Sequence, residues 1–89
     1  MGKFAKVVRS ILSGDSDSNI AFSDLRNVLI RLGFQERVKG SHHIFWKDDL
    51  PEILNIQPNS SEAKPYQVKQ VRELIVRYHL SGEVGDADE

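Results

Sequence analysis

The 89-residue sequence contains no cysteine and no long apolar run, and each absence excludes a class of protein. Without cysteine, the chain cannot be a disulfide-stapled domain or hold a Cys-ligated zinc ion. Lys3, Lys6 and Arg9 interrupt the N-terminal segment, so it is neither a signal-peptide core nor a membrane span. We therefore expect one small cytoplasmic domain, stabilised by apolar burial and helix caps, with no membrane contact.

The sequence also lacks the basic excess that is typical of nucleic-acid-binding proteins, because its formal net charge is -1. The charge is unevenly distributed, however. Residues 83–89 contain four of the 13 acidic residues and are predicted to be a disordered acidic tail. Residues 1–82, predicted to form a single domain, keep all 12 Lys and Arg residues and carry a net charge of +3. This domain is therefore compatible with a polyanionic ligand.

Three segments have the apolar spacing of amphipathic helices. The first covers residues 3–13, before Gly14, and its apolar positions are Phe4, Val7, Val8, Ile11 and Leu12. The second is predicted to begin with Ser23 as its N-cap and to end at Gly33. There Phe34 should pack back on Leu29, as in a Schellman cap. The third should begin at Pro65 and end at Gly82.

Residues between these helices predict a sheet, because β-branched and aromatic side chains occur there in short runs. Three strands fit, near residues 34–39, 41–47 and 53–57, and their short connections favour an antiparallel meander. The predicted fold class is α+β, in the order α-β-β-β-α. Two helices should cover one face of the three-stranded sheet. An additional N-terminal helix, residues 1–14, should pack beside a core of residues 20–80.

The densest cluster of reactive side chains is the segment Arg37-Val38-Lys39-Gly40-Ser41-His42-His43. Glycine permits a tight turn and close approach of a phosphate, cations hold that phosphate, and imidazole suits proton transfer near neutral pH. The alternative is that Gly40 only makes a hairpin and the histidines are surface residues. Strand alternation puts His42, Ile44 and Trp46 on one face and Ser41, His43 and Phe45 on the other, unless a bulge intervenes.

The same alternation argues against two other chemistries. Neighbouring strand residues diverge, so His42 and His43 do not readily bind one metal ion, and Ser41 does not readily pair with His42 as a nucleophile. We therefore predict no metal site and assign Ser41 to phosphate contact. The sequence also has no phosphate-binding loop or dinucleotide motif, so no cofactor is expected.

A second basic cluster lies at the start of the third helix. Free backbone N–H groups there, together with nearby cations and an aromatic ring, suit a polyanion with stackable bases. The alternative is an ordinary solvated basic face. The candidate RNA-binding residues of this cluster are Lys64, Tyr66, Lys69 and Arg72.

These features together resemble the HicA family, the mRNA-cleaving toxins of bacterial HicA-HicB toxin–antitoxin systems. The resemblance spans about residues 23–80. It is carried by Leu32-Gly33-Phe34, by Lys39-Gly40-Ser41-His42-His43-Ile44-Phe45, by Ile56-Gln57-Pro58 and by Lys64-Pro65-Tyr66. The Gly-Ser-His-His segment after Leu-Gly-Phe is its most specific part.

The resemblance implies a fold similar to double-stranded-RNA-binding domains and a ribonuclease that needs no metal. It also implies one essential histidine, carried over to His42, and a HicB-like antitoxin partner. The candidate RNA-binding residues beside His42 are then Lys39, Gly40, Ser41 and His43. The chain departs from the family pattern at Asn59, where many members have histidine, and in its additional N-terminal helix.

Two other functions remain open at this stage. One is a non-catalytic RNA-binding module of similar fold, which would tolerate loss of His42. The other is an interaction subunit that uses the apolar stripe of the first helix to bind a partner. These alternatives predict different consequences for removing His42 or residues 1–14.

Overall fold

The structure, a computed structural model that describes residues 2–80, is α+β with one antiparallel sheet. The predicted acidic tail, residues 83–89, lies outside the described residues. The helices are α1 (Lys3–Ser13), α2 (Phe22–Arg31) and α3 (Pro65–Arg77), with a short 3-10 turn, η1, at Asp17–Asn19. The strands are β1 (Gln35–Lys39), β2 (His42–Trp46) and β3 (Ile53–Ile56), in the order β1-β2-β3. The predicted meander is therefore confirmed.

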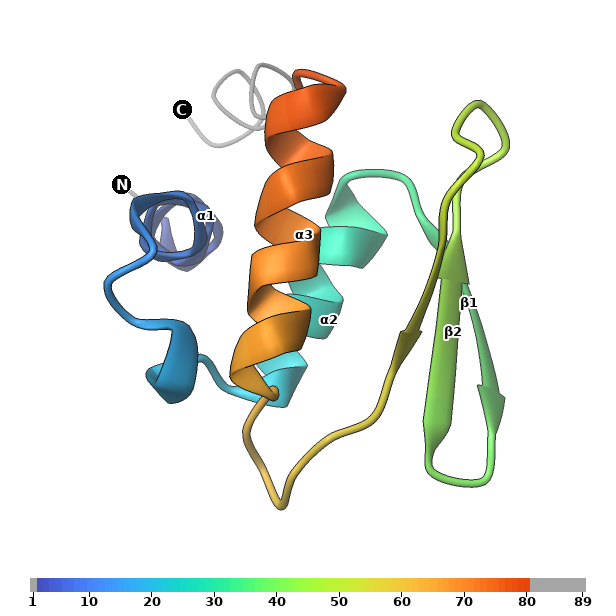
Figure 1. Cartoon of the computed structure of the whole chain (residues 1–89), viewed down its shortest axis with the longest axis horizontal. Helices are drawn as coiled ribbons and strands as arrows, with labels where there is room; N and C mark the ends of the chain where they lie inside the picture. Colours follow the sequence, from blue (N-terminus) through green and yellow to red (C-terminus); the bar gives the residue numbers. More distant parts are fainter. Residues whose placement is uncertain (1, 81–89) are drawn as a thin grey trace.

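The elements form three layers (Figure 1). All the helices lie on one side of the sheet, with α2 and α3 beside it and α1 on their outer side. Phe45 and Leu54 of the sheet, at 0% and 5% exposed, pack into the same core as helix residues such as Leu25 and Val71. No described element covers the opposite face of the sheet, so that face is open to solvent.

Helix α1 buries its apolar stripe against the domain itself. Phe4, Val8 and Ile11 are buried in the common core, and α1 contacts both α2 and α3. Val7 and Leu12 are partly buried against the same cluster. Within the described residues, α1 is therefore part of the domain and its stripe is not left free for a partner.

The junction between α2 and β1 has the predicted Schellman geometry. The Phe34 N–H donates to the Leu29 carbonyl at 3.0 Å, and the Gly33 N–H donates to the Ile30 carbonyl at 3.0 Å. Gly33 has φ +100°, which glycine adopts without strain. Because Phe34 and Leu29 are both buried, this cap fixes the direction in which β1 leaves the helix.

Two predicted helix ends are wrong, for different physical reasons. Ser23 lies inside α2, whose N-cap is Ala21 without a side-chain cap. The Phe22 N–H donates instead to the Ser61 carbonyl, 2.9 Å away. Helix α3 ends at Arg77, before Gly82, because His79 adopts the left-handed conformation at φ 57° and the Leu80 N–H returns to the Ile75 carbonyl.

Candidate functional site

His42 is the first residue of β2 and projects from the open face of the sheet. The strands have no bulge, because the pairing runs without a break from Lys39↔His42 to Gln35↔Trp46. Phe45 is fully buried beneath the helices, so His42, three positions away, faces the other side. Of the two possibilities that the sequence left open, the structure has the unbroken alternation, and it leaves His42 exposed.

An amide oxygen holds the His42 ring. His42 Nδ1 lies 3.2 Å from Asn55 Oδ1, on the neighbouring strand β3. An amide oxygen can only accept a hydrogen bond, so this contact favours the tautomer with the proton on Nδ1. The Nε2 atom then carries a free lone pair toward solvent, as a general base requires.

Polar contacts from β3 and α3 support this arrangement. Gln57 Nε2 donates to Ser41 Oγ at 3.1 Å, which ties the turn to the end of β3. Gln67 of α3 is 1% exposed and, in the amide orientation that satisfies both of its ends, donates to the Gln57 carbonyl and accepts from the Gln57 N–H. Sequence reasoning missed Asn55, Gln57 and Gln67, because their contacts depend on strand register and helix docking.

The β1–β2 turn leaves room beside His42. Gly40 has φ +60°, and a Cβ placed there would meet no atom within 4 Å. This glycine is therefore required by the backbone conformation of the turn, and the space above it is open. Lys39 pairs with His42, and Arg37 shares the open face one row further along. Both cations are exposed and form no ion pair within residues 2–80.

His43 lies on the opposite face, in a different environment. Its Nδ1 is 2.9 Å from Glu36 Oε2, and its ring meets Phe22 edge-on at 4.7 Å. Glu36 also accepts from Arg26 Nε and Nη2 at 2.6–2.9 Å. The hydrogen bond from Arg26, assisted by the one from His43, lowers the pKa of Glu36 against the opposing effect of burial. The two histidines therefore cannot act together on one group.

The predicted basic cluster at the start of α3 is only partly a surface. Tyr66 is 57% exposed, Lys69 is exposed and Lys64 is half-buried. The start of α3 lies at the same end of the molecule as the β1–β2 turn, and Gln67 joins it to the end of β3 (Figure 1). Three of the four predicted residues therefore lie at the end of the domain that carries His42.

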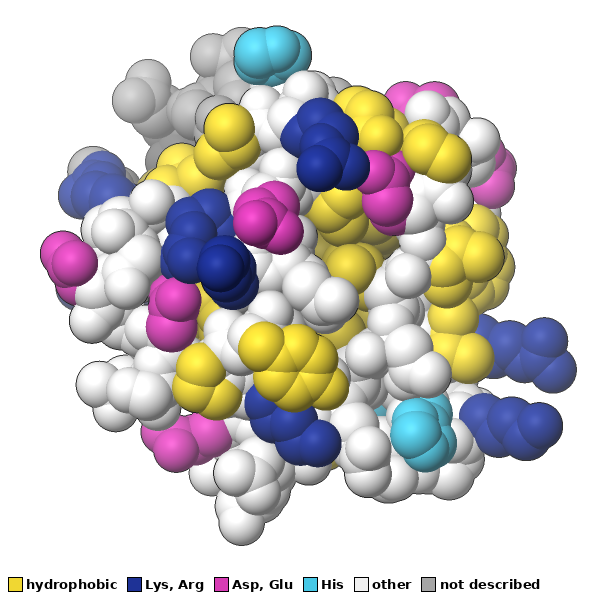
Figure 2. Space-filling view, viewed as in Figure 1, with side chains coloured by type: hydrophobic (Ala, Val, Ile, Leu, Met, Phe, Trp, Pro, Cys, Tyr) yellow, Lys and Arg dark blue, Asp and Glu magenta, His cyan; other side chains and the backbone are white. Residues whose placement is uncertain are grey.

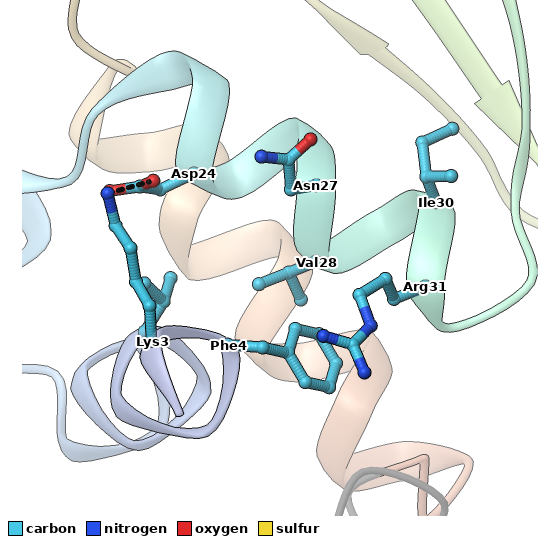
Figure 3. Close-up of a pocket in the computed structure, with 8 residues that line it drawn as sticks. Lys3, Phe4, Asp24, Asn27, Val28, Ile30 and Arg31 are labelled. Atoms are coloured by element: carbon cyan, nitrogen blue, oxygen red, sulfur yellow. Dashed lines mark ion pairs between the residues drawn. The ribbon is translucent and has the colours of Figure 1, made fainter. Parts of the chain in front are cut away.

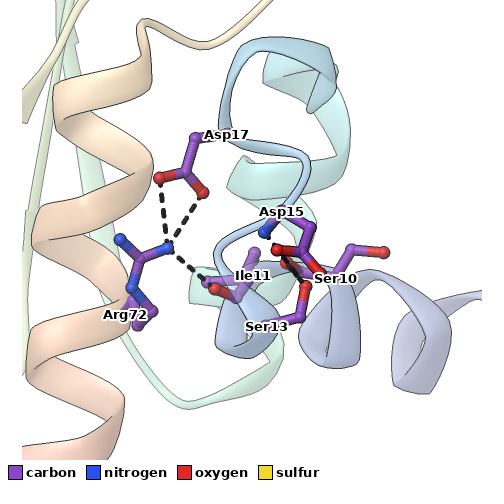
Figure 4. A network of polar contacts seen from close by, with 6 residues as sticks. All are labelled: Ser10, Ile11, Ser13, Asp15, Asp17 and Arg72. Atoms are coloured by element: carbon purple, nitrogen blue, oxygen red, sulfur yellow. Dashed lines mark hydrogen bonds and ion pairs between the residues drawn. The ribbon is translucent and has the colours of Figure 1, made fainter.

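Arg72, the fourth predicted RNA-binding residue of this cluster, forms hydrogen bonds inside the domain. Its Nη1 donates to the Ile11 carbonyl at 3.1 Å and to the Asp17 carboxylate at 2.9 Å (Figure 4). The Arg72 side chain is 21% exposed and joins α3 to α1 and η1. Its charge is thus balanced by Asp17, so Arg72 contributes less to a phosphate surface than the sequence suggested.

Other parts of the described chain offer little reactive chemistry. A hollow of about 270 Å³ lies between α1 and α2, lined by Phe4, Val28 and an ion pair of Lys3 with Asp24 (Figure 3). It contains no histidine or hydroxyl group. Within residues 2–80, no group of three or more His, Asp or Glu side chains could hold a metal ion, and no helix has the length and hydrophobicity to cross a bilayer.

Comparison with known proteins identifies the family. The family model described as the HicA toxin of bacterial toxin–antitoxin systems matches residues 22–79, which cover α2, the whole sheet and α3. No curated protein and no solved structure matches the chain. Helix α1 lies before the matched region. The matched region is well over half of the sequence, and the chain therefore belongs to the HicA toxin family of bacterial toxin–antitoxin systems.

Proposed function

We propose that this protein is the toxin of a type II toxin–antitoxin pair, a metal-independent endoribonuclease that cleaves mRNA with His42 as its catalytic group. The observation that carries the proposal is the His42–Asn55 contact on an exposed face. It gives one imidazole a defined tautomer with its reactive nitrogen free. An mRNA substrate would place this activity in the cytoplasm.

The chemistry is simple because RNA supplies its own nucleophile. Nε2 of His42 takes the proton of the ribose 2′-OH as the 2′ oxygen attacks the adjacent phosphorus. The bond from phosphorus to the 5′ oxygen breaks, and this oxygen receives a proton from the imidazolium or from water. The products are a 2′,3′-cyclic phosphate and a 5′-hydroxyl end. Such general acid–base catalysis contributes about 10²–10⁴-fold.

The remaining predicted residues would bind the phosphates. Lys39 lies beside His42 and can stabilise the charge that develops on the reacting phosphate. The space above Gly40 lets the RNA backbone approach, and the hydroxyl of Ser41, in the same turn, would contact a phosphate. Lys64, Tyr66 and Lys69 would hold the RNA further along, while His43 would act through its contacts with Glu36 and Phe22 and not as a catalytic group.

A HicB-like antitoxin would neutralise this activity by covering His42. The family match supports an antitoxin partner, and the small exposed site is easily blocked. A non-catalytic RNA-binding module is the alternative, and it would bind the same RNA without cutting it.

The proposal is tested with the purified full chain and a single-stranded RNA in the presence of EDTA. We expect cleavage that leaves 2′,3′-cyclic phosphate ends and is absent on the 2′-O-methyl form of the same RNA. Cleavage of the 2′-O-methyl RNA would refute the mechanism, and activity that EDTA removes would refute metal independence. Binding of the RNA with no cleavage would favour the alternative.

A further inference from the structure

The open face of the sheet combines apolar and cationic side chains in a way that neither solvation nor core packing requires. We call this surface the open face and define it by six residues, Arg37, Lys39, His42, Ile44, Trp46 and Ile53. Cross-strand pairing puts Trp46 beside Ile53, and Lys39 beside His42. Ile53 is 69% exposed, and Trp46 and Ile44 are only half-buried.

The apolar residues of the open face, Ile44, Trp46 and Ile53, lie on the neighbouring strands β2 and β3. Helices α1 to α3 all lie on the other side of the sheet, so none of them covers this face (Figure 1). The space-filling view shows hydrophobic side chains on the sheet side of the molecule, with Lys and Arg side chains projecting next to them beside a histidine (Figure 2). An exposed patch of this kind indicates an interaction site.

The charged side chains of the open face near His42, Arg37 and Lys39, have one sign. Glu36 is the only acidic residue of the three strands, and it lies on the helix side, bound to Arg26. Asp48 borders this face at the end away from His42, because it accepts a hydrogen bond from Gln35, which pairs with Trp46. A partner that fits this surface must therefore be anionic where it meets Arg37 and Lys39, and must present flat apolar groups to Trp46 and Ile53.

Single-stranded nucleic acid has both properties. Unpaired bases stack on aromatic and aliphatic side chains, whereas bases in a duplex already stack on one another and present only their edges. The distance along β2 from Trp46 to His42 is four residues, or about 13 Å, which is the scale of a few nucleotides. A duplex bound through its backbone would leave Trp46 and Ile53 without a role.

We infer that the open face binds single-stranded RNA, with unpaired bases on Trp46 and Ile53 and the backbone along Arg37 and Lys39 toward His42. This inference rests on the proposed function, because His42 shares the surface. It adds a specificity: the substrate must be unpaired where it crosses the sheet. It also gives Arg37, Trp46 and Ile53 defined places on one RNA-binding surface.

The chain offers a direct probe, because Trp46 is its only tryptophan. The full wild-type protein is titrated with a 2′-O-methyl oligonucleotide, which is not cleaved by the proposed mechanism, in single-stranded form and as a duplex of the same sequence. We expect the single strand to change Trp46 fluorescence saturably and to bind at least tenfold more tightly than the duplex.

Matched variants distinguish RNA binding at the open face from a general effect of protein charge on RNA binding. Ile53→Asp should weaken binding of the single strand about tenfold, whereas Val76→Asp, at a comparably exposed site on α3, should leave it unchanged. Arg37→Gln should weaken binding, and Lys6→Gln on α1 should have no effect. Melting temperatures verify that each variant folds.

The outcomes are distinguishable from those of the proposed function. Three results would overturn the inference, even if RNA is cleaved. The duplex could bind as tightly as the single strand, Ile53→Asp and Val76→Asp could have equal effects, or RNA could bind without changing Trp46 fluorescence. A Trp46 response to an antitoxin protein but not to RNA would also overturn it. Single-strand binding with no cleavage of ordinary RNA would support the inference and refute the nuclease.

Discussion

Replacing Glu36 with glutamine tests whether the contacts around His43 are structural. The Glu36 carboxylate is 9% exposed and accepts hydrogen bonds from Arg26 and from His43 Nδ1. Glutamine keeps the shape of the side chain but removes its charge and turns an N–H₂ group toward groups that are themselves donors. One change therefore weakens both contacts without opening a cavity.

The size of the effect follows from the exposure of the partners. Hydrogen bonds to charged groups contribute about 1.5–3 kcal/mol each when buried. The Arg26 side chain is 43% exposed, so water compensates part of its loss. We expect Glu36→Gln to lower the free energy of unfolding by about 1–2 kcal/mol, which for a domain of this size lowers the melting temperature by about 5–15 °C.

The effect should depend on pH in a defined direction. Hydrogen bonds from Arg26 and His43 lower the pKa of Glu36 below its unfolded value, which is about 4.3. Because its pKa is lowered on folding, the Glu36 carboxylate contributes its full stabilisation above the unfolded pKa. This stabilisation is lost as pH falls through the folded pKa. The difference between wild type and Glu36→Gln should therefore be full at pH 7 and shrink below about pH 4.

Urea unfolding of both proteins across this pH range is the assay, with RNA cleavage measured well below both melting temperatures. Unchanged stability at pH 7, or a difference that does not shrink in acid, would refute the structural account. A variant with normal stability but no cleavage would show that His43, oriented by Glu36, is the reacting imidazole instead of His42.

Three further substitutions test other contacts. Arg72→Ala should cost about 1–2 kcal/mol in urea unfolding, because it leaves Asp17 unpaired, and should not change RNA affinity; weaker RNA binding at normal stability would contradict this. His79→Gly should raise the free energy of unfolding by about 0.5–1 kcal/mol, because glycine adopts φ 57° without strain; a lower melting temperature would argue otherwise. Asn55→Ala should slow cleavage about tenfold and alter its pH profile, because the His42 tautomer is no longer fixed; an unchanged rate and profile would exclude this role.

Local signals explain most of what could be predicted from the sequence. The Gly33-Phe34 cap and Pro65 at the start of α3 depend on neighbouring residues only, and both were predicted. The alternation along β2 likewise placed His42 and Phe45 on opposite faces. Such features are visible in a short window of sequence.

The features that could not be predicted come from distant parts of the chain. Ser23 would be a good N-cap in isolation, but the Ser61 carbonyl, nearly forty residues away, satisfies the start of α2. Arg72 was interpreted as a surface cation because Asp17 is 55 residues away in the sequence. The contacts of Asn55 and Gln67 likewise exist only once the sheet has formed and α3 has docked on it.

The most direct test of the central claim is the rate at which His42→Ala cleaves single-stranded RNA in EDTA, measured beside wild type. His42 is exposed, so its removal should leave the melting temperature unchanged. We predict that the cleavage rate falls about 10²–10⁴-fold while RNA affinity changes little. Cleavage by His42→Ala at the wild-type rate would contradict the account.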